Sequence, residues 1–344
     1  MRLTFAAMAL CATVLATAVS GCTVPLPPAQ KPPEPAPAPA QELIVEPQAG
    51  YQPIYDFIDG ASKSVDMTMY QLQDTKAQDA LKAAANRGVR VRVLLDSDIQ
   101  GGGSPTMNKA AYSDLTTSGV EVRWAWPGTL WHQKSITRDG TDAAIMTANL
   151  YAPYYPIVRD FAVFTNNRAT VAGMDATFER DWEATGSPPA TGTVPPGSEL
   201  VWSPGAQTPL VDLIDSARSG TTIWTESEQL DSLPIQQALV SAAKRGVTVN
   251  YLMTYDSDWA AGLNALASGG VHVRVYQPSA PIYIHAKALT VNDDTAYAGS
   301  ANFTTAMTDQ NRNVGIITKN PAVVSGIRST IASDFAGAAP YDGQ

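Results

Sequence analysis

The order of hydrophobic and polar residues predicts alternating strands and helices, and the order occurs twice. Residues 64–72 form an apolar run that is typical of a strand, and residues 89–95 alternate valine with arginine before becoming fully apolar. Between them, the alanines and leucine of residues 80–85 are spaced to cover one face of a helix, which we expect to end at residues 87–88. Residues 221–226 begin the same order again. Strand, helix and strand predict an α/β fold with mostly parallel or mixed sheets covered by helices.

The second half of the chain repeats short segments of the first. Residues 55–59 (YDFID) recur as residues 211–215 (VDLID), and residues 118–123 (SGVEVR) recur as residues 269–274 (GGVHVR). Matching segments in the same order are typical of duplicated domains. We therefore predict an N-terminal domain at residues 42–186, a linker rich in proline and glycine at 187–198, and a C-terminal domain at 199–344.

The N-terminus has the composition of an export signal. Arg2 precedes an uncharged apolar segment at residues 5–19, and Val19-Ser20-Gly21-Cys22 matches the small residues that precede a lipidated cysteine. An ordinary secretory signal peptide is the alternative. The proline-rich residues 22–41 predict an extended tether rather than a folded element. We therefore expect removal of residues 1–21 and an exported protein whose Cys22 is lipid-anchored, outside the cytoplasmic membrane or in the outer membrane.

Composition narrows the range of partners. The chain has 23 Lys and Arg against 32 Asp and Glu, a formal net charge of −9. An acidic protein is not attracted to polyanions by its overall field, so the charge disfavours nucleic acid while allowing a local basic pocket. The glycines of residues 101–103 lack the Gly-Lys-Ser/Thr ending of a phosphate-binding loop, and they predict a flexible loop.

Two matching segments carry side chains suited to phosphate chemistry. Each has a histidine, a lysine two positions later and an asparagine seventeen positions after the histidine: His132, Lys134 and Asn149, then His285, Lys287 and Asn302. An imidazole can attack phosphorus, and a second imidazolium can protonate the leaving oxygen. Lysine and asparagine can stabilise charge on the remaining phosphate oxygens. Alternate residues of a strand share a face, so we expect the second histidine and lysine on one side of a strand at residues 284–291. The third histidine, His272, is expected to be an ordinary core or surface residue.

The pattern His-x-Lys-(x)4-Asp followed by Gly-Ser-x-Asn resembles the signature of the phospholipase D superfamily. The resemblance extends over the whole body after the tether, and it implies two tandem α/β/α domains with one active site at their interface. It also implies cleavage of a phosphodiester without a metal or other cofactor. One histidine would form a phosphohistidine and the other would protonate the departing alcohol. His132 and His285 would then be this pair, the two lysines and two asparagines would hold the phosphate, and Ser300 and Thr147 would add hydroxyl donors.

The two copies of the motif differ in ways that affect its chemistry. Asp139 completes the first copy, whereas Asn292 stands at the matching place in the second, and we expect a structural role for this position. Eleven residues after the motif asparagine, where the family usually has an acid that orients a histidine, stand Asp160 and Asn313. A carboxylate raises the basicity of an imidazole, whereas an amide only orients it. We therefore predict unequal histidines and, by analogy, assign His132 as the nucleophile.

These features favour hydrolysis of phospholipid head groups, or transfer to another alcohol, by a membrane-tethered enzyme. An extracellular nuclease and a catalytically silent lipoprotein that binds phosphorylated ligands are alternatives. A cardiolipin synthase would use the same intermediate, but such enzymes usually carry spanning helices, and no later apolar run approaches the ~20 residues required. Aromatic residues near the motifs would line a groove for acyl chains or bases, or belong to the core: Trp124, Trp126, Trp131, Tyr151, Tyr154, Tyr155, Tyr276 and Tyr283.

Overall fold

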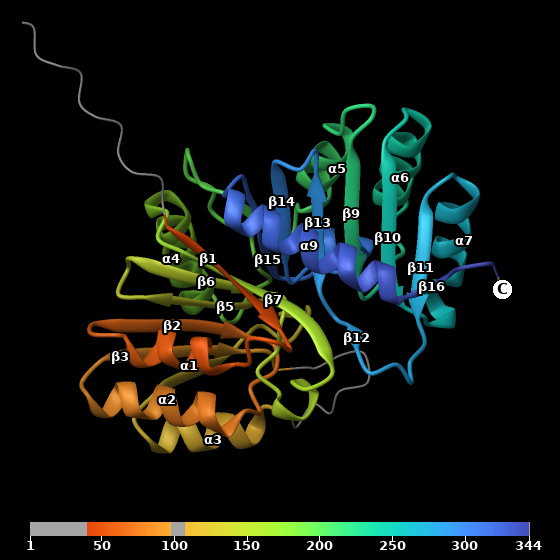
Figure 1. Ribbon diagram of the computed structural model, residues 1–344. Helices are drawn as coiled ribbons and strands as arrows, with labels where there is room; N and C mark the ends of the chain where they lie inside the picture. The colour runs from red at the N-terminus through yellow and green to blue at the C-terminus, as the bar shows by residue number, and fades with distance from the viewer. Residues whose placement is uncertain (1–39, 98–106, 344) are drawn as a thin grey trace, which may run out of the picture. The chain divides into compact units, whose positions relative to one another are not determined.

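The structure is a computed structural model that describes residues 40–97 and 107–343 (Figure 1). The predicted export signal, Cys22, nearly all of the tether and the glycine-rich loop at 101–103 lie outside the described residues. Among the helices of the described part, none is both long and apolar enough to cross a membrane.

The first half forms an eight-stranded sheet with the order β1-β7-β6-β5-β2-β3-β4, and β12 of the second half pairs with β7. Its strands are β1 (Gln41–Glu46), β2 (Ser64–Met69), β3 (Arg90–Leu95), β4 (Glu121–Trp124), β5 (Lys134–Arg138), β6 (Asp142–Met146) and β7 (Val158–Thr165). The helices of this half are α1 (Gln52–Asp59), α2 (Thr75–Asn86), α3 (Lys109–Thr117), η1 (Ala152–Tyr154) and α4 (Arg168–Glu183).

The second half forms another eight-stranded sheet with the order β16-β11-β10-β9-β13-β14-β15-β8. The strands of this half are β8 (Leu200–Ser203), β9 (Thr222–Ser227), β10 (Thr248–Thr254), β11 (His272–Tyr276), β12 (Tyr283–Ile284), β13 (Lys287–Val291), β14 (Thr295–Gly299), β15 (Asn313–Thr318) and β16 (Ala339–Pro340). Its helices are α5 (Gln207–Asp215), α6 (Leu233–Lys244), η2 (Ser257–Trp259), α7 (Ala260–Ser268), α8 (Thr305–Asp309) and α9 (Pro321–Gly337).

The predicted helix over residues 80–85 is confirmed as part of α2. The Asp74 side chain caps its N-terminus by accepting a hydrogen bond from the backbone N–H of Lys76 at 2.9 Å. The helix ends at Asn86 with Arg87 as its C-cap, and Gly88 follows with φ +87°, a conformation that glycine adopts without strain. In the second half Ser232 caps α6 and Gly246 follows it with the same φ, so the duplicated sequence produces duplicated helix ends.

The two-domain α/β architecture is confirmed, and of the two alternatives that the sequence left open, mostly parallel or mixed sheets, the structure has mixed sheets. Among the strand pairs of the described residues, nine of fourteen are antiparallel. The reason lies in the tight turns after β5 and β13, which are too short for the crossover that a parallel connection needs. Asp139 and Gly140 have φ of 56° and 68°, and Asn292 and Asp293 have 57° and 59°, as in hairpin turns of this kind.

The two halves share a buried core. Helices α1, α2 and α3 pack on one side of the first sheet, and α5, α6 and α7 on one side of the second. A separate cluster joins both sheets through α4 and α9, with Val171 and Met174 on α4 and Val323 and Ile327 on α9. The halves are therefore held together by apolar packing that runs between the sheets, and residues at this junction are shielded from water.

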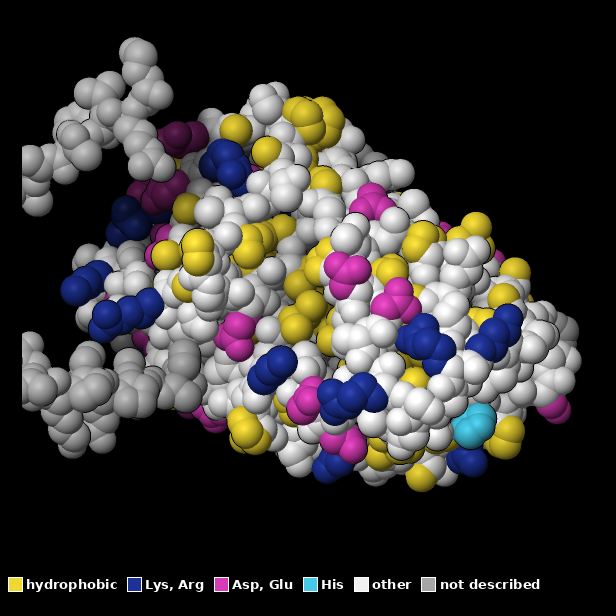
Figure 2. All heavy atoms as spheres, turned by 90° about the horizontal axis from the view of Figure 1, so that it is seen from above, with side chains coloured by type: hydrophobic (Ala, Val, Ile, Leu, Met, Phe, Trp, Pro, Cys, Tyr) yellow, Lys and Arg dark blue, Asp and Glu magenta, His cyan; other side chains and the backbone are white. Residues whose placement is uncertain are grey.

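The outer surface mixes charges of both signs. On the face drawn in Figure 2, Lys and Arg side chains lie among Asp and Glu side chains, and they do not gather into one extended basic patch. This distribution agrees with the acidic composition of the chain.

Candidate active site

Each motif histidine lies where the chain crosses from one sheet to the other. We expected one strand over residues 284–291, and this prediction is wrong: β12 ends at Ile284, and β13 begins at Lys287. Before the break, Ile284 pairs with Arg159 of β7 in the first half, and the Arg159 carbonyl accepts hydrogen bonds from the backbone N–H of His285 and Ala286. In the first half, Trp131 forms the equivalent bridge to Arg312 before β5 begins. The partner strands come from the opposite half, which single-strand periodicity does not reveal.

Two buried ion pairs hold the two halves together at the places where the chain crosses between the sheets. Arg159 Nε lies 2.5 Å from Asp334 Oδ2 on α9, and Arg312 Nη2 lies 2.6 Å from Asp181 Oδ1 on α4. Each pair joins one half to the other, and all four side chains are nearly or fully buried. A buried ion pair holds a specific geometry because removing one partner leaves an uncompensated charge. These pairs fix β7 and β15 against the opposing halves.

The residue after each arginine orients the histidine of the opposite half. His285 Nδ1 donates to the Asp160 carboxylate at 2.8 Å, whereas His132 Nδ1 donates to the Ser300 carbonyl at 3.0 Å and to Asn313 Oδ1 at 3.2 Å. With Nδ1 carrying the hydrogen, Nε2 of each neutral ring has a free lone pair. The predicted inequality of the two histidines therefore has a physical counterpart: one imidazole faces a carboxylate and the other faces an amide.

The hydroxyl groups of the motifs support these orienting residues. Thr147 Oγ1 donates to the Asp160 carboxylate and accepts from the backbone N–H of Phe161 at 2.8 Å. Ser300 Oγ donates to Asn313 Oδ1 at 3.0 Å and accepts from Val314 N–H at 3.2 Å. We expected both hydroxyls to act as donors to the phosphate. The structure instead directs their hydrogens to Asp160 and Asn313, because the hydroxyls are fully buried behind the histidines.

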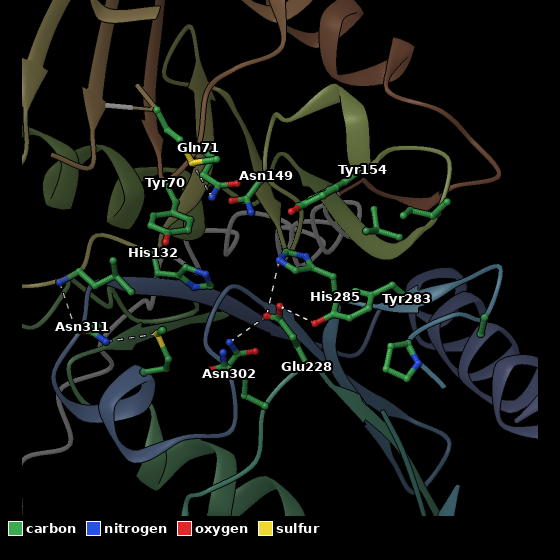
Figure 3. Close-up of a pocket in the computed structure, with 18 residues that line it drawn as sticks. Tyr70, Gln71, His132, Asn149, Tyr154, Glu228, Tyr283, His285, Asn302 and Asn311 are labelled. Carbon is green, nitrogen blue, oxygen red and sulfur yellow. Dashed lines mark hydrogen bonds and ion pairs between the residues drawn. The ribbon is translucent and has the colours of Figure 1, made fainter. Parts of the chain in front are cut away.

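Both histidines and both asparagines line one cavity of about 690 Å³ (Figure 3). The lysine side chains are fully buried and are not among the residues that line the cavity, but each donates to the backbone of a histidine that does. Lys134 Nζ donates to the His132 carbonyl at 2.7 Å, and Lys287 Nζ donates to the His285 carbonyl and to Glu228 Oε2, the latter at 2.9 Å. The six residues predicted from the motifs are thus brought together from two halves of the chain.

Glu228 is a site residue that the sequence analysis missed. Its Oε2 accepts hydrogen bonds from Lys287 and, at 3.2 Å, from Asn302 Nδ2, and it lies 3.8 Å from His285 Nε2 (Figure 3). A signal for it exists, since Glu228 directly follows β9, and Ser227 of β9 pairs with Lys287 in register. In the first half Tyr70 follows β2 at the matching place, where Met69 pairs with Lys134. A comparison of the two copies of the repeat does not reveal this acid, because the residue at the matching place in the first copy is Tyr70.

The electrostatics of the site follow from burial and from two close lysines. Burial, and next the positive charges of Lys134 and Lys287, lower the pKa of His132 well below its usual range. Burial and the charge of Lys287 also lower the pKa of Lys134. Burial alone would raise the pKa of Glu228, but the charge of Lys287 and the hydrogen bond from it hold that pKa well below its usual range. Near neutral pH, His132 is therefore an uncharged imidazole and Glu228 a carboxylate.

Asp139, the last residue of the first motif, lies outside the cavity lining. Its carboxylate accepts hydrogen bonds from the backbone N–H groups of Ser62, Lys63 and Ser64. Burial raises its pKa, but these backbone hydrogen bonds outweigh burial and lower the pKa to about 2. Asn292 has a similar structural role in the second half, because its Oδ1 accepts a hydrogen bond from the backbone N–H of Arg218 at 2.9 Å. In both copies this residue holds a turn.

The aromatic residues near the motifs divide between the core and the cavity. Tyr154 and Tyr283 line the cavity, together with Tyr70, which the sequence analysis did not select. Trp131 is buried in a small core cluster, and Trp124 stacks on Tyr112 with ring centroids 4.4 Å apart. Most of these aromatics are therefore structural. His272 is exposed on β11, and within the described part of the chain no group of three or more His, Cys, Asp or Glu side chains could hold a metal ion.

Comparison with known proteins agrees with this arrangement. A family model described as "Cardiolipin synthase, PLD-like domain" matches residues 54–182 and 210–335. Two relatives from Bacillus subtilis (strain 168) are the probable cardiolipin synthase YwiE, 28% identical over 130 residues, and the major cardiolipin synthase ClsA, 23% identical over 304 residues. These matches span 38% and 76% of this chain but only 26% and 60% of the two relatives.

A solved structure extends the likeness of the fold. The phosphatidylserine synthase from Haemophilus influenzae Rd KW20 superposes with a TM-score of 0.67 at 10% identity, over 88% of this chain and 87% of that one. The two family matches coincide with the two sheet-forming halves, and the residues that they bring together are those of the duplicated motif. The chain therefore belongs to the phospholipase D superfamily, whose members cleave or transfer phosphodiesters.

Proposed function

We propose that the protein is a metal-independent phosphodiesterase of the phospholipase D type, which cleaves phospholipid head groups through a phosphohistidine on His132. The observation that carries the proposal is the pair of imidazoles that line one cavity with unequal partners. His132 is neutral and held by an amide and a carbonyl, whereas His285 is held by the Asp160 carboxylate at 2.8 Å. A neutral imidazole suits attack, and an imidazole beside a carboxylate suits proton transfer.

In the first step, His132 Nε2 attacks phosphorus and a P–N bond forms. The bond from phosphorus to the head-group oxygen breaks, and that oxygen takes a proton from Nε2 of the His285 imidazolium. Asp160 stabilises the positive charge that His285 carries before this transfer. In the second step, His285 removes a proton from water or from another alcohol, whose oxygen attacks phosphorus and breaks the P–N bond. Water yields phosphatidic acid, and an alcohol yields a new diester.

The lysines and asparagines stabilise the charge of the reacting phosphoryl group. Lys134 and Lys287 are fully buried beside the cavity, and Asn149 and Asn302 line it from opposite halves. Donors that are fixed before the reaction cost no reorganisation when charge moves to the phosphate oxygens. The structural repeat thus supplies two sets of donors to one phosphate.

The mouth of the cavity supports a lipid substrate. Two segments border it, residues 151–157 and 277–283, and neither contains a charged residue. Tyr154 and Ile157 are 49% and 46% exposed there, although they are large and hydrophobic. The Tyr283 backbone N–H donates to the Ile157 carbonyl, so the two segments lie side by side. An exposed apolar rim with aromatic side chains suits the interface between water and lipid, whereas a nuclease would need basic residues there.

Several parts of this proposal rest on expectations from the sequence and on relatives. Export and a lipid anchor on Cys22 would hold the enzyme at the membrane where its substrate lies. The names of the Bacillus relatives support transfer to an alcohol as a second candidate beside hydrolysis, through the same phosphohistidine. A nuclease is disfavoured by the net charge of −9. A silent binding protein is disfavoured by the retention of both imidazoles in one cavity.

The proposal is tested by head-group release from mixed phospholipid vesicles in the presence of EDTA. The full chain is compared with His132→Ala, His285→Ala and the exposed His272→Ala as a matched control. We expect release by the wild type and by His272→Ala, and loss of release in both cavity variants. No release from any vesicle by a folded wild type, with cleavage of single-stranded DNA instead, would refute the lipid substrate and favour the nuclease.

A further inference from the structure

Glu228 places a carboxylate beside the proposed general acid, on one side of the cavity only. Its side chain is 18% exposed, and its two oxygens have different partners. Oε2 accepts hydrogen bonds from Lys287 and Asn302, and Oε1 accepts one from the Tyr283 hydroxyl at 3.4 Å (Figure 3). At the matching place in the first half stands Tyr70, which carries no charge. The two ends of the cavity are therefore chemically different.

Glu228 can accept a further hydrogen bond from a bound substrate. Lys287 Nζ has three hydrogens and Asn302 Nδ2 has two, so both can donate to a phosphate while they keep their hydrogen bonds to Glu228 Oε2. A carboxylate has about four lone-pair positions, and among the described residues the one donor to Oε1 is the Tyr283 hydroxyl, at 3.4 Å. Oε1 can therefore accept a hydrogen bond from a donor of the substrate.

The geometry of the reaction indicates which part of the substrate supplies that donor. Attack by His132 displaces the leaving alcohol from the opposite side of phosphorus, where His285 protonates it. His285 Nε2 lies 3.8 Å from Glu228 Oε2, so the leaving alcohol departs next to this carboxylate. The Tyr283 ring and hydroxyl border the same part of the cavity (Figure 3).

From these contacts we infer that Glu228 and Tyr283 form a head-group subsite for alcohols that carry a second hydrogen-bond donor. A hydroxyl, as in glycerol, and a primary ammonium, as in ethanolamine, have such a donor, whereas trimethylated choline has none. The inference rests on the proposed function. Because the second step reverses the geometry of the first, an acceptor alcohol would enter through the same subsite, and the enzyme would favour polyols as acceptors.

The test uses vesicles that contain phosphatidylglycerol, phosphatidylethanolamine and phosphatidylcholine together, so that all three share one surface charge. Release of glycerol, ethanolamine and choline is measured at once with EDTA present. The full-length wild type is compared with Glu228→Gln, with Tyr283→Phe and with Glu121→Gln, the same substitution at an exposed position on β4. Thermal unfolding of each variant shows whether it is folded.

We expect the wild type to prefer glycerol and ethanolamine over choline by about 10-fold to 100-fold, the effect of one hydrogen bond to a charged group. Glu228→Gln should remove most of this preference, measured as the ratio of the three release rates whatever the overall rate, and Tyr283→Phe should reduce the preference in part. Glu121→Gln should leave the ratios unchanged. Equal loss for all three head groups in a folded Glu228→Gln, or a wild type that prefers choline, would overturn the subsite and leave the proposed function standing. No release by the wild type would overturn both.

Discussion

Replacing Asp160 with asparagine tests whether His285 is the general acid. The second half already shows that an amide fits this place, because Asn313 Oδ1 accepts from His132 Nδ1 at 3.2 Å and from Ser300 Oγ at 3.0 Å. Asp160→Asn can keep both hydrogen bonds, from His285 and from Thr147, through its remaining oxygen. The substitution therefore removes the negative charge while preserving the shape of the site.

The expected size of the effect follows from burial and distance. The Asp160 and His285 side chains are 2% and 11% exposed, and Nδ1 lies 2.8 Å from Oδ1. A hydrogen bond between charged groups contributes about 1.5–3 kcal/mol, and an amide acceptor retains part of it. Loss of about 1–2 kcal/mol from the transition state corresponds to a rate about 5-fold to 30-fold lower.

The assay compares two leaving groups in the first step. A diester with an alkyl leaving group needs a proton from His285, whereas p-nitrophenolate leaves without one. We expect Asp160→Asn to slow alkyl release by the factor above and to change the p-nitrophenolate burst by no more than about threefold. Equal slowing of both leaving groups in a folded variant would refute the acid role, since it would show that Asp160 only maintains the structure.

Further predictions concern pH, stability and the turn. Because the pKa of His132 is lowered, kcat/KM on a soluble diester should not decrease until pH falls below about 6.5. The stability that this group contributes should be full above about pH 6.5 and decrease below it. A decline of the rate, or of the free energy of urea unfolding, that begins at pH 7.5 as pH falls would contradict this prediction. Arg312→Met should lower the free energy of unfolding in urea by about 3–5 kcal/mol, because Asp181 stays buried without its partner. The double variant Arg312→Met/Asp181→Leu should recover most of that loss. An Arg312→Met variant as stable as the wild type would show that the ion pair contributes nothing to stability. Asp139→Asn should lower the free energy of unfolding by about 1–2 kcal/mol and leave kcat unchanged. The difference in stability between the wild type and this variant should disappear as pH falls from about 4 to 2. A tenfold loss of kcat would instead show that Asp139 takes part in the reaction.

The sequence predicts the duplicated framework well because its signals are local. The alternation before Leu95, the cap and glycine around α2 and the spacing of His285, Lys287 and Asn302 all act within one half. The sequence analysis left the direction of the strands open, although the turn residues Asp139 and Asn292 mark antiparallel connections, because strand periodicity does not report direction.

Contacts between the halves could not be predicted in this way. Asp160 and His285 are 125 residues apart, and they meet because β12 leaves its own sheet and pairs with β7. The same exchange breaks the expected strand at His285. Glu228 was missed because it occupies a position where the repeat diverges from Tyr70, and its function depends on Lys287 reaching it from a neighbouring strand. Such contacts depend on packing between distant segments, and local pattern carries little information about them.

The most direct test of the account is to map the covalent intermediate. In His285→Ala, a p-nitrophenyl diester has a leaving group that needs no acid, and the base for the second step is missing, so the adduct should accumulate. After an alkaline quench, peptide mass mapping should find the phosphoryl group on His132 in His285→Ala, and no adduct in His132→Ala. An adduct on His285 in His132→Ala would reverse the assigned roles. No adduct in either variant, while the wild type shows a burst, would contradict the phosphohistidine mechanism itself.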